Sequence, residues 1–385
     1  QLVIKFGGCV LQAIFTHARK LDGPVLIHTL TKKGKGYEPA EDDPARYHGV
    51  KPFKVENGEH KTASNGRSFS EIAVDTLIKL AAMDDRICAI SAAMLVGTKL
   101  QKFKAEYPDR CFDVGLAEEH AVTFSAGLAA AGMKPAVCIY STFLQRSYDQ
   151  ILHDVALQDL PVAFFLDRAG LVGADGPTHH GTFDLSFMRS IPGLVLMAPK
   201  DENELQDMVA TAMNCDGPAA VRYPRGTGPG VEVAEEPTIL DIGKAEQLRD
   251  GRDVAIIAEG RMVQNALKAC EMLEAEGIQA RLINARFIKP LDEKMIAEVA
   301  ADCGVIVTVE ENVLPGGFGS AVGEVLVQKD LDADLRSLGI PDEFVQHGDV
   351  EILWEQVGLT PEAIANQVVT FLEQKNHLRH RAPSS

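Results

Sequence analysis

Residues 135–167, PAVCIYSTFLQRSYDQILHDVALQDLPVAFFLD, hold the pattern that decides the fold. Two apolar segments of strand length, 135–141 and 161–167, enclose a segment with a helical pattern, 144–157. Because the apolar segments are nearly continuous, we expect strands that are buried on both faces of a sheet. Strands joined through a helix run parallel, so this stretch predicts one strand-helix-strand unit of a parallel sheet.

The same alternation extends in both directions along the chain. It predicts further strands at 86–91, 110–114, 194–199, 218–224, 253–260, 279–285 and 304–311. It predicts helices at 70–83, 118–131 and 201–214, and another that ends at residue 276. The expected fold is therefore a doubly wound, mostly parallel α/β sheet followed by a smaller α/β domain. The expected bounds are 67–228 for the first domain, 229–250 for a linker rich in Gly, Pro and Glu, 251–374 for the second domain and 375–385 for a polar tail.

Composition limits the classes of partner. The chain has 385 residues, 46% of them hydrophobic and 24% charged, which suits a globular protein of two or three domains. Its net charge of −17 argues against nucleic acid or an anionic membrane surface as the main partner. Seven scattered cysteines without a CxxC pair argue against structural zinc and a disulfide framework, and favour a reducing compartment. We find no run of 18 apolar residues and no signal peptide, so we expect no membrane segment.

Polar side chains gather where the predicted strands end. Open α/β sheets bind their ligands at the carboxyl edge of the strands. The residues that follow the strands of the first domain are Glu118, Tyr140, Phe143, Arg146, Arg168, Asp175, His179, His180, Arg222 and Arg225. Acidic, aromatic, imidazole and guanidinium groups at one edge predict a site for an anionic substrate.

From the residues alone, each of these positions also has an ordinary structural explanation. A glutamate at a helix start, such as Glu118, complements the helix dipole by up to about 1 kcal/mol. Phe143 could belong to the core, and Arg146 could bridge to Asp149 at the surface. A single histidine or arginine is more often a structural or solvated group than a catalytic one.

Four segments carry a resemblance to a known family. They are LAEEHAVTFSAGLAAAG (116–132), YSTFLQRSYDQILHDVALQDLPV (140–162), DRAGLVGADGPTHHGTFDLSF (167–187) and VRYPRG (221–226). Together they resemble 1-deoxy-D-xylulose-5-phosphate synthase, a thiamine-diphosphate-dependent family of the transketolase superfamily. The resemblance implies that the first domain is a pyrimidine-binding, transketolase-like domain and the second a transketolase C-terminal domain.

This resemblance implies an activity. A transferase of this family uses thiamine diphosphate and Mg²⁺ to condense pyruvate with glyceraldehyde 3-phosphate, with loss of carbon dioxide. The product, 1-deoxy-D-xylulose 5-phosphate, feeds isoprenoid, thiamine and pyridoxal biosynthesis. The resemblance also implies a homodimer that is cytoplasmic, or located in the plastid in a plant or alga.

The resemblance assigns roles to individual residues. Glu118 becomes the acid that activates the cofactor, because a carboxyl group in a dry pocket can share a proton with the pyrimidine ring. His48 and His179 become candidates for proton transfer. The other assignments are Tyr37, Phe143 and Arg146 for cofactor binding, and Tyr140, Arg168, Asp175 and Arg225 for the substrate and its phosphate. Glu119 takes a place where Gln is usual, and His180 receives no role.

Two features depart from the family pattern. The family holds the diphosphate and magnesium in a Gly-Asp-Gly element of its first domain, and this sequence contains no such triplet. We therefore expect residues 1–66 to be a remnant of that domain with its linker, no metal ligand in this chain, and poor cofactor binding by the chain alone. The second departure is SAAMLVGTKL (91–100), where the family tends to have a Pro-bearing, Gly-richer turn.

Two other functions stay open at this point. The β-type subunit of a 2-oxo-acid dehydrogenase also joins a pyrimidine-binding domain to such a C-terminal domain and takes its diphosphate site from a partner chain. A non-catalytic homologue that serves as a dimerisation or regulatory module would show the same pattern. GADGPTHHGTFDLS (173–186) and YPRG (223–226) favour the synthase.

Overall fold

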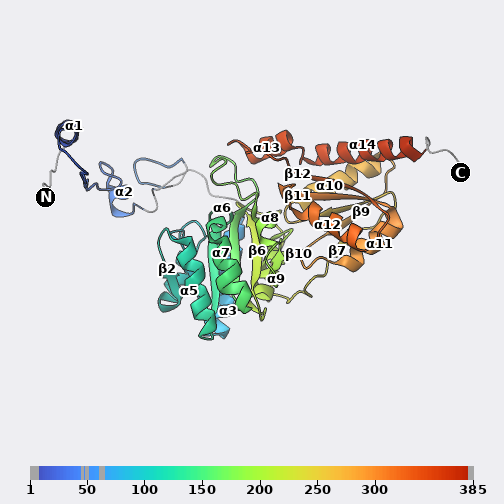
Figure 1. Cartoon of the computed structure of the whole chain (residues 1–385), viewed down its shortest axis with the longest axis horizontal. Helices are drawn as coiled ribbons and strands as arrows, with labels where there is room; N and C mark the ends of the chain where they lie inside the picture. Colours follow the sequence, from blue (N-terminus) through green and yellow to red (C-terminus); the bar gives the residue numbers. More distant parts are fainter. Residues whose placement is uncertain (1–7, 45–46, 48–51, 60–65, 380–385) are drawn as a thin grey trace. The chain divides into compact units, whose positions relative to one another are not determined.

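A computed structural model describes residues 8–44, 47, 52–59 and 66–379 of the chain (Figure 1). The chain divides into two units, Gln1–Ser64 and Asn65–Ser385, which we describe separately. His48 lies outside the described residues. Among the helices of the described ranges, none is both long enough and apolar enough to cross a lipid bilayer.

The described residues of the first unit include two helices, α1 (Gly8–Ala18) and α2 (Glu38–Asp42). Tyr37 directly precedes α2, and its hydroxyl donates to the Val55 carbonyl at 2.9 Å. Its ring lies edge-on to Tyr47, with the centroids 5.6 Å apart, and 5.8 Å from the ring of Phe53. These three rings form an aromatic cluster in the described part of this unit.

A seven-stranded sheet lies at the centre of the first half of the second unit. Its strands, in spatial order, are β10 (Phe287–Lys289), β5 (Val195–Met197), β6 (Ala219–Pro224), β4 (Ala163–Ala169), β3 (Lys134–Tyr140), β1 (Ile87–Ser91) and β2 (Cys111–Asp113). All neighbours are parallel except β10 and β5. The chain runs outward from β1 to β2 and then returns to β3 on the other side of β1. The predicted doubly wound, mostly parallel sheet is therefore confirmed.

Helices cover both faces of this sheet (Figure 1). On one face, α3 (Phe69–Met83) and α9 (Glu202–Met213) share a core with Phe165 of β4. On the other face, α5 (Glu118–Ala130) shares a core with Phe164 of the same strand. Because successive side chains of β4 point to opposite faces of the sheet, this buried strand contributes to two separate cores. Other short helices of this half are α4 (Gln101–Glu106), η1 (Pro108–Arg110) and α8 (Asp184–Met188).

The stretch between β3 and β4 differs from the single helix expected over 144–157. It consists of α6 (Ser141–Leu144), η2 (Gln145–Ser147), α7 (Tyr148–Gln150), the π-helical turn η3 (Ile151–Val155) and η4 (Ala156–Gln158). The spacing of the backbone hydrogen bonds therefore changes several times between α6 and η4. The π-turn takes up an extra residue, and both of its ends, Ile151 and Val155, are fully buried.

The second sheet is smaller. Its strands, in spatial order, are β12 (Asp334–Ile340), β11 (Val305–Val313), β8 (Val254–Ala258), β9 (Ala280–Asn284) and β7 (Glu246–Arg249). All neighbours are parallel except β7 and β9. The helices α10 (Met262–Ala275) and α14 (Pro361–Arg379) share a core on one face of this sheet. The other helices are α11 (Glu293–Cys303), α12 (Phe318–Gln328) and α13 (Val350–Val357).

Three strands were missing from the sequence analysis. The strands β7 (EQLR) and β12 (DLRSLGI) lack a continuous apolar run, and β10 has three residues. Such short or polar edge strands carry little periodic signal. β7 lies within the stretch expected to be a linker, and β10 leaves its neighbours in the sequence to pair with β5 of the first sheet.

The two sheets of the second unit share one core. Leu196, Ile257 and Ile306, which come from strands of both sheets, belong to the same hydrophobic cluster. The connecting segment 228–240 is bonded to α9 along its length. Glu202 accepts from the Gly230 amide at 2.8 Å, and Asp207 accepts from the Thr238 amide at 2.7 Å. These bonds hold the connecting segment against α9, and Asn65–Ser385 forms one compact unit.

Candidate functional site

The predicted site residues of the second unit gather at the carboxyl edge of the first sheet. β1 and β3 flank the point where the strand order reverses, and open α/β sheets bind ligands at such points. Gly97 lies in the turn after β1, close to Tyr140 at the end of β3. A Cβ atom at position 97 would lie 1.8 Å from the Tyr140 hydroxyl oxygen. The segment 91–100 therefore forms a wall beside Tyr140 that leaves room only for glycine.

Arg168 and Tyr140 contact each other at the centre of this edge. Arg168 has a φ of 61°, a left-handed conformation that costs a residue with a side chain on the order of 1–3 kcal/mol. Its guanidinium carbon lies over the Tyr140 ring, 4.0 Å from the centroid. Phe143 stacks on Tyr140 at 5.6 Å, and His179 meets Phe143 edge-on at 5.4 Å. The structure thus brings four predicted site residues together.

Asp175 bridges two arginines of this edge. Its Oδ2 accepts from Arg168 Nη1 at 3.0 Å and from Arg225 Nη1 at 2.8 Å. Arg225 also donates to the Val172 carbonyl at 3.1 Å. The side chains of Arg225 and Asp175 are 38% and 34% exposed, so a ligand can reach them. Guanidinium groups that converge on one anionic oxygen can also hold a phosphate group.

Glu118 is the first residue of α5, and its side chain is 3% exposed. Within the described part of the chain, the bonds to its carboxylate come from Arg146 Nη1, at 3.3 and 3.4 Å. These distances are long for a charge-assisted hydrogen bond, so the carboxylate retains capacity for another partner. Arg146 is 58% exposed and pairs with Glu118, which makes a bridge to Asp149 unnecessary to explain its position.

The two adjacent histidines have different surroundings. His179 is half-buried, and its Nδ1 lies 2.9 Å from Thr178 Oγ1. His180 is buried, and its Nδ1 accepts from the Val172 amide at 3.0 Å, while its Nε2 lies 3.2 Å from the Gln346 carbonyl. Burial lowers the pKa of His180, which fits a neutral ring that carries its proton on Nε2. His180 therefore acts as a structural bridge to the C-terminal domain.

The other two predicted site residues cannot be placed at this edge. Tyr37 belongs to the first unit, within the aromatic cluster. His48 lies outside the described residues. The assignments of these two residues stay predictions.

The prediction that Arg222 lies at the ligand edge is wrong. Arg222 is buried, with Nε 3.0 Å from Asp184 Oδ1, Nη1 2.9 Å from Glu259 Oε2, and Nη2 donating to the Glu311 carbonyl at 3.1 Å. Burial alone would lower the pKa of this guanidinium, but the charges of Asp184 and Glu259 raise it above its ordinary value. Its neighbour Tyr223 fills the core under α3 and α9, so alternation along β6 turns Arg222 to the opposite side.

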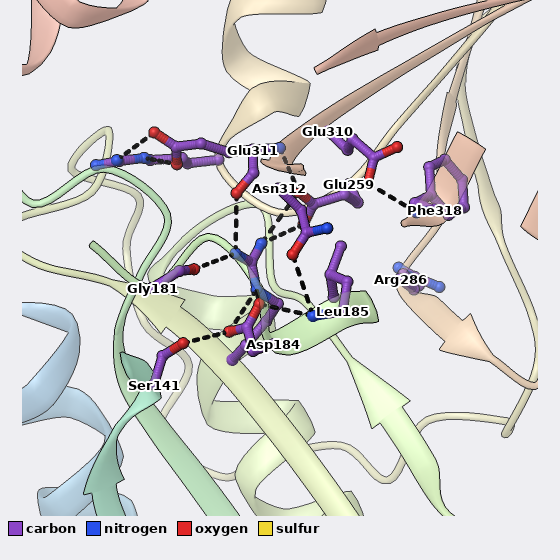
Figure 2. A network of polar contacts seen from close by, with 12 residues as sticks. Ser141, Gly181, Asp184, Leu185, Glu259, Arg286, Glu310, Glu311, Asn312 and Phe318 are labelled. Atoms are coloured by element: carbon purple, nitrogen blue, oxygen red, sulfur yellow. Dashed lines mark hydrogen bonds and ion pairs between the residues drawn. The ribbon is translucent and has the colours of Figure 1, made fainter. Parts of the chain in front are cut away.

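Two further carboxyl groups are buried near the ends of strands. Burial raises the pKa of Asp167 to about 6, and its Oδ2 accepts from Ser70 Oγ at 2.6 Å. Burial raises the pKa of Glu310 to about 8, and its carboxylate accepts from the amides of Phe318 and Gly319 at 2.7 and 2.8 Å. Figure 2 shows Glu310 directed at Phe318, where α12 begins. Neither group could be predicted from the sequence, because the burial of a carboxylate depends on the remote segments that pack around it.

Metal and thiol chemistry find no support in the described residues. In residues 8–44, 47, 52–59 and 66–379, no group of three or more His, Cys, Asp or Glu side chains could hold a metal ion. Burial raises the pKa of the thiols of Cys88, Cys111, Cys215 and Cys270 to about 11. Since the thiolate is the nucleophile, these four cysteines are poor candidates for catalysis.

Two known families match parts of this chain. Residues 66–230 match the family described as "Transketolase, pyrimidine binding domain". Residues 243–364 match the family described as "Transketolase, C-terminal domain". The first matched stretch contains β1 to β6, and the second contains β7 to β12. β10 lies in the second stretch but pairs with β5 of the first sheet.

Curated relatives of this chain are named 1-deoxy-D-xylulose-5-phosphate synthase. The protein of Heliobacterium modesticaldum is 55% identical over 355 residues, which are 92% of this chain and 55% of that protein. The protein of Desulforudis audaxviator is 53% identical over 370 residues, which are 96% of this chain and 57% of that protein. The chain thus spans somewhat more than half the length of the curated relatives that it matches.

Solved structures show the same fold. A structure titled "Split gene transketolase, inactive beta4 tetramer" is 31% identical, with a TM-score of 0.72, over 80% of this chain and 99% of that one. A transketolase from Campylobacter jejuni is 20% identical, with a TM-score of 0.65, over 79% of this chain and 46% of that one. At 20% identity, the second likeness supports the fold alone.

Proposed function

Since this chain belongs to the transketolase superfamily, we propose that it carries out, with thiamine diphosphate and Mg²⁺, the condensation of pyruvate with glyceraldehyde 3-phosphate to 1-deoxy-D-xylulose 5-phosphate. The name of the curated relatives supports the reaction. The observation that carries the proposal is the buried Glu118 carboxylate at the start of α5. We propose 67–228 and 251–374 as the bounds of the two domains that contribute to it.

The side chains around Glu118 fit the pyrimidine end of thiamine diphosphate. A buried carboxyl group with spare hydrogen-bonding capacity can hold a proton against a ring nitrogen. Phe143 offers an apolar face on which a ring can stack, and Arg146 orients the Glu118 carboxylate. When bound, thiamine diphosphate supplies the electron sink for the loss of carbon dioxide. The part played by this chain is to hold the proton at a Glu118 carboxylate oxygen and to keep water away from it.

Arg168, Arg225 and Tyr140 are proposed to bind the phosphate of the aldehyde substrate. Both guanidinium groups already converge on Asp175, so a ligand meets oriented donors rather than freely rotating ones. His179 lies beside Phe143 and is proposed to move a proton at the aldehyde oxygen.

The ligands for magnesium and diphosphate are proposed to lie outside the described residues, which hold no cluster suited to a metal. A similar solved structure carries a title that calls it an inactive tetramer of a split-gene transketolase. This likeness supports our proposal that the described residues need a complementing domain or chain for tight cofactor binding and activity. We propose a homodimer that acts on small molecules, and a cytoplasmic location stays a prediction.

The same title favours a second candidate function. In it, the chain is a subunit without activity of its own. Such a subunit would be one of the two alternatives that the sequence leaves open, a β-type subunit of a 2-oxo-acid dehydrogenase or a non-catalytic module. The two candidates differ in what a complementing domain does. Only the synthase forms 1-deoxy-D-xylulose 5-phosphate after the first domain of a curated relative has been added.

Cofactor titration and complementation test the proposal. We expect calorimetry to show weak binding of thiamine diphosphate and Mg²⁺ to the chain alone, and tight binding with synthase activity once the first domain of a curated relative is added. Tight binding by the chain alone would contradict the need for a complementing domain. Tight binding without product after complementation would favour the second candidate.

Two neighbouring glutamates provide a matched pair of variants. In the complemented enzyme, Glu118→Gln keeps the shape of the side chain but removes its proton, so hydrogen exchange at C2 of the cofactor should slow by about 100-fold or more. Glu119 is exposed on the same turn of α5, and Glu119→Gln should leave the exchange rate unchanged. Nuclear magnetic resonance follows this exchange directly. The assignment of Glu118 is wrong if Glu119→Gln is the damaging change and Glu118→Gln is silent.

A further inference from the structure

Residues 171–180, which we call the 171–180 loop, connect β4 to the segment before α8 and carry Asp175 and His179. The ends of this loop are held together by Gly170 and Gly181. The Gly170 amide donates to the Gly181 carbonyl at 2.7 Å, and the Gly181 amide donates back at 2.8 Å. These two bonds close the loop at its base but do not fix the residues within it. The C-terminal domain adds contacts to the first residue of the loop, Leu171.

Glu311 and Arg261 bind both backbone groups of Leu171, the first residue of the loop. Glu311 Oε1 accepts from the Leu171 amide at 3.2 Å, and Arg261 Nη2 donates to the Leu171 carbonyl at 2.7 Å. Arg261 and Glu311 also form a two-bond ion pair, with both distances at 2.6 Å. Trp354 adds a bond from its Nε1 to Glu311 Oε1 at 2.7 Å. The carboxylate is 2% exposed, so solvent does not replace these contacts.

The residue before Leu171 confirms how closely the ion pair approaches the backbone. Gly170 has a φ of 74°, which favours glycine. A Cβ atom at this position would lie 2.2 Å from Glu311 Oε2. The glycine thus permits the carboxylate to contact the main chain of the loop directly.

The next residue, Val172, connects Leu171 to the proposed phosphate site. Its carbonyl accepts from Arg225 Nη1 at 3.1 Å, and the same nitrogen donates to Asp175. Its amide donates to His180 Nδ1, and the opposite ring nitrogen of His180 lies against the Gln346 carbonyl of the C-terminal domain. A displacement of Leu171 would therefore move an acceptor of Arg225.

We propose that Glu311 and Arg261 are positioning residues of the phosphate site, through which the C-terminal domain sets the place of Arg225 and Asp175. This inference rests on the proposed function, since it assumes that these two residues bind the aldehyde substrate. Glu311 and Arg261 touch no substrate themselves and act through the main chain of Leu171 and Val172.

A purely stabilising role would not require this arrangement. Buried ion pairs can often be replaced by apolar side chains without loss of stability. An apolar pair could not bind an amide and a carbonyl of one residue at the same time, and both groups would then be buried without partners. The polar pair thus fixes the direction in which the loop leaves β4.

The first measurement is hydrogen exchange of the loop amides, which needs no substrate. Glu311→Gln removes the charge that holds Arg261, and we expect exchange of residues 171–176 to accelerate by about 10-fold or more while α9 keeps its protection. Arg189→Ala is the matched control, because it removes an ion pair with Glu324 at 2.5 Å that also joins the two domains but does not contact the loop. The control should leave loop exchange unchanged.

The second measurement is made in the complemented enzyme. Glu311→Gln should raise the KM for glyceraldehyde 3-phosphate by about 10- to 100-fold and leave the KM for pyruvate unchanged, because only the phosphate site is displaced. If Glu311→Gln does not fold, Arg261→Lys replaces it. A lysine keeps the positive charge but cannot bridge Glu311 and the Leu171 carbonyl with a planar fork.

Each outcome decides the proposal. Faster loop exchange together with a selective rise in the KM for the aldehyde supports it. Unchanged loop exchange, or faster exchange with both KM values unchanged or raised equally, overturns it. If the complemented wild type forms no product, the proposed function fails, and titration with inorganic phosphate replaces the KM measurement. Weaker phosphate binding by Glu311→Gln than by Arg189→Ala then supports the positioning role, and equal binding overturns it.

Discussion

Replacing Arg222 by methionine tests whether this residue serves structure rather than substrate binding. Methionine is of similar length and apolar, so it fills much of the same space without a charge. The substitution removes every bond between the guanidinium and Asp184, Glu259 and the Glu311 carbonyl. It leaves two carboxylates, each with a side chain 0% exposed, without their positive partner.

The expected loss of stability is large. Removing one partner of a buried ion pair costs about 3–5 kcal/mol, because the remaining charge is left unpaired in a poorly polarisable surrounding. Arg222 has two such partners, so we expect Arg222→Met to reach the upper end of that range. Adding Glu259→Gln neutralises one of the stranded carboxylates. The double variant should therefore recover on the order of 1–3 kcal/mol relative to Arg222→Met.

The loss should also depend on pH. Burial already raises the pKa of Glu259 in the wild type, and loss of Arg222 removes the nearest charge that opposes this shift. When the pKa of a carboxyl group is raised in the folded state, the folded protein loses stability as the pH rises above the pKa of that group in the unfolded chain, which is about 4.3 for glutamate. The deficit of Arg222→Met should therefore be smaller at pH 5 than at pH 8.

Urea unfolding followed by circular dichroism at both pH values measures these differences. Substrate binding provides the contrast, because Arg222→Met should alter stability far more than the discrimination between the two substrates. A loss below about 1 kcal/mol would refute the reasoning, since that is the range of exposed ion pairs. A loss that is the same at pH 5 and pH 8 would also contradict it.

Three further substitutions follow from the site. Arg225→Ala should raise the KM for glyceraldehyde 3-phosphate by the equivalent of about 2–3 kcal/mol and leave the KM for pyruvate unchanged. Steady-state kinetics of the complemented enzyme measures both KM values, and an equal rise in both would exclude the phosphate role. Asp167→Asn keeps a side-chain acceptor for the Ser70 hydroxyl. Because burial raises the pKa of Asp167 to about 6, ionisation of this carboxyl group destabilises the folded wild type as the pH rises from 4 to 7. Thermal unfolding should thus find this variant more stable than wild type at pH 7.5, by about 3 kcal/mol, and not at pH 4. Gly97→Ala places a Cβ atom against the Tyr140 hydroxyl and should weaken binding of the phosphorylated aldehyde, and an unchanged KM would show that Tyr140 moves without consequence.

Much of the site could be predicted because parallel strands bring their carboxyl ends to one edge. Tyr140 is the last residue of β3, Arg168 is the last but one of β4, and Arg225 follows β6. The two arginines meet at Asp175, and Arg168 lies over the Tyr140 ring. Arg222 was misplaced because one residue along a strand reverses the direction of a side chain. The apolar pattern of β6 does not reveal which of its two faces meets the second domain.

The residues that position the site could not be predicted from the sequence. Gly97 is distinguished by its approach to Tyr140, and Glu311 by its contacts with Leu171 and Arg261, which come from distant parts of the chain. Nothing in the order of residues relates positions 171 and 311. Their contact arises because two sheets share one core.

Local pattern alone was sufficient for the class of fold and for the buried strands of both sheets. Continuous apolar segments need cover on both faces, and the helical segments between them force a parallel arrangement. The tertiary structure decided the short edge strands β7, β10 and β12, the broken helix after β3 and the charges that become buried. These depend on which remote segments meet, and a hydrophobic period describes only how a segment relates to its own neighbours in the chain. An ion pair such as Arg222 with Glu259 is determined by the packing of two domains, because burial and distance set its energy.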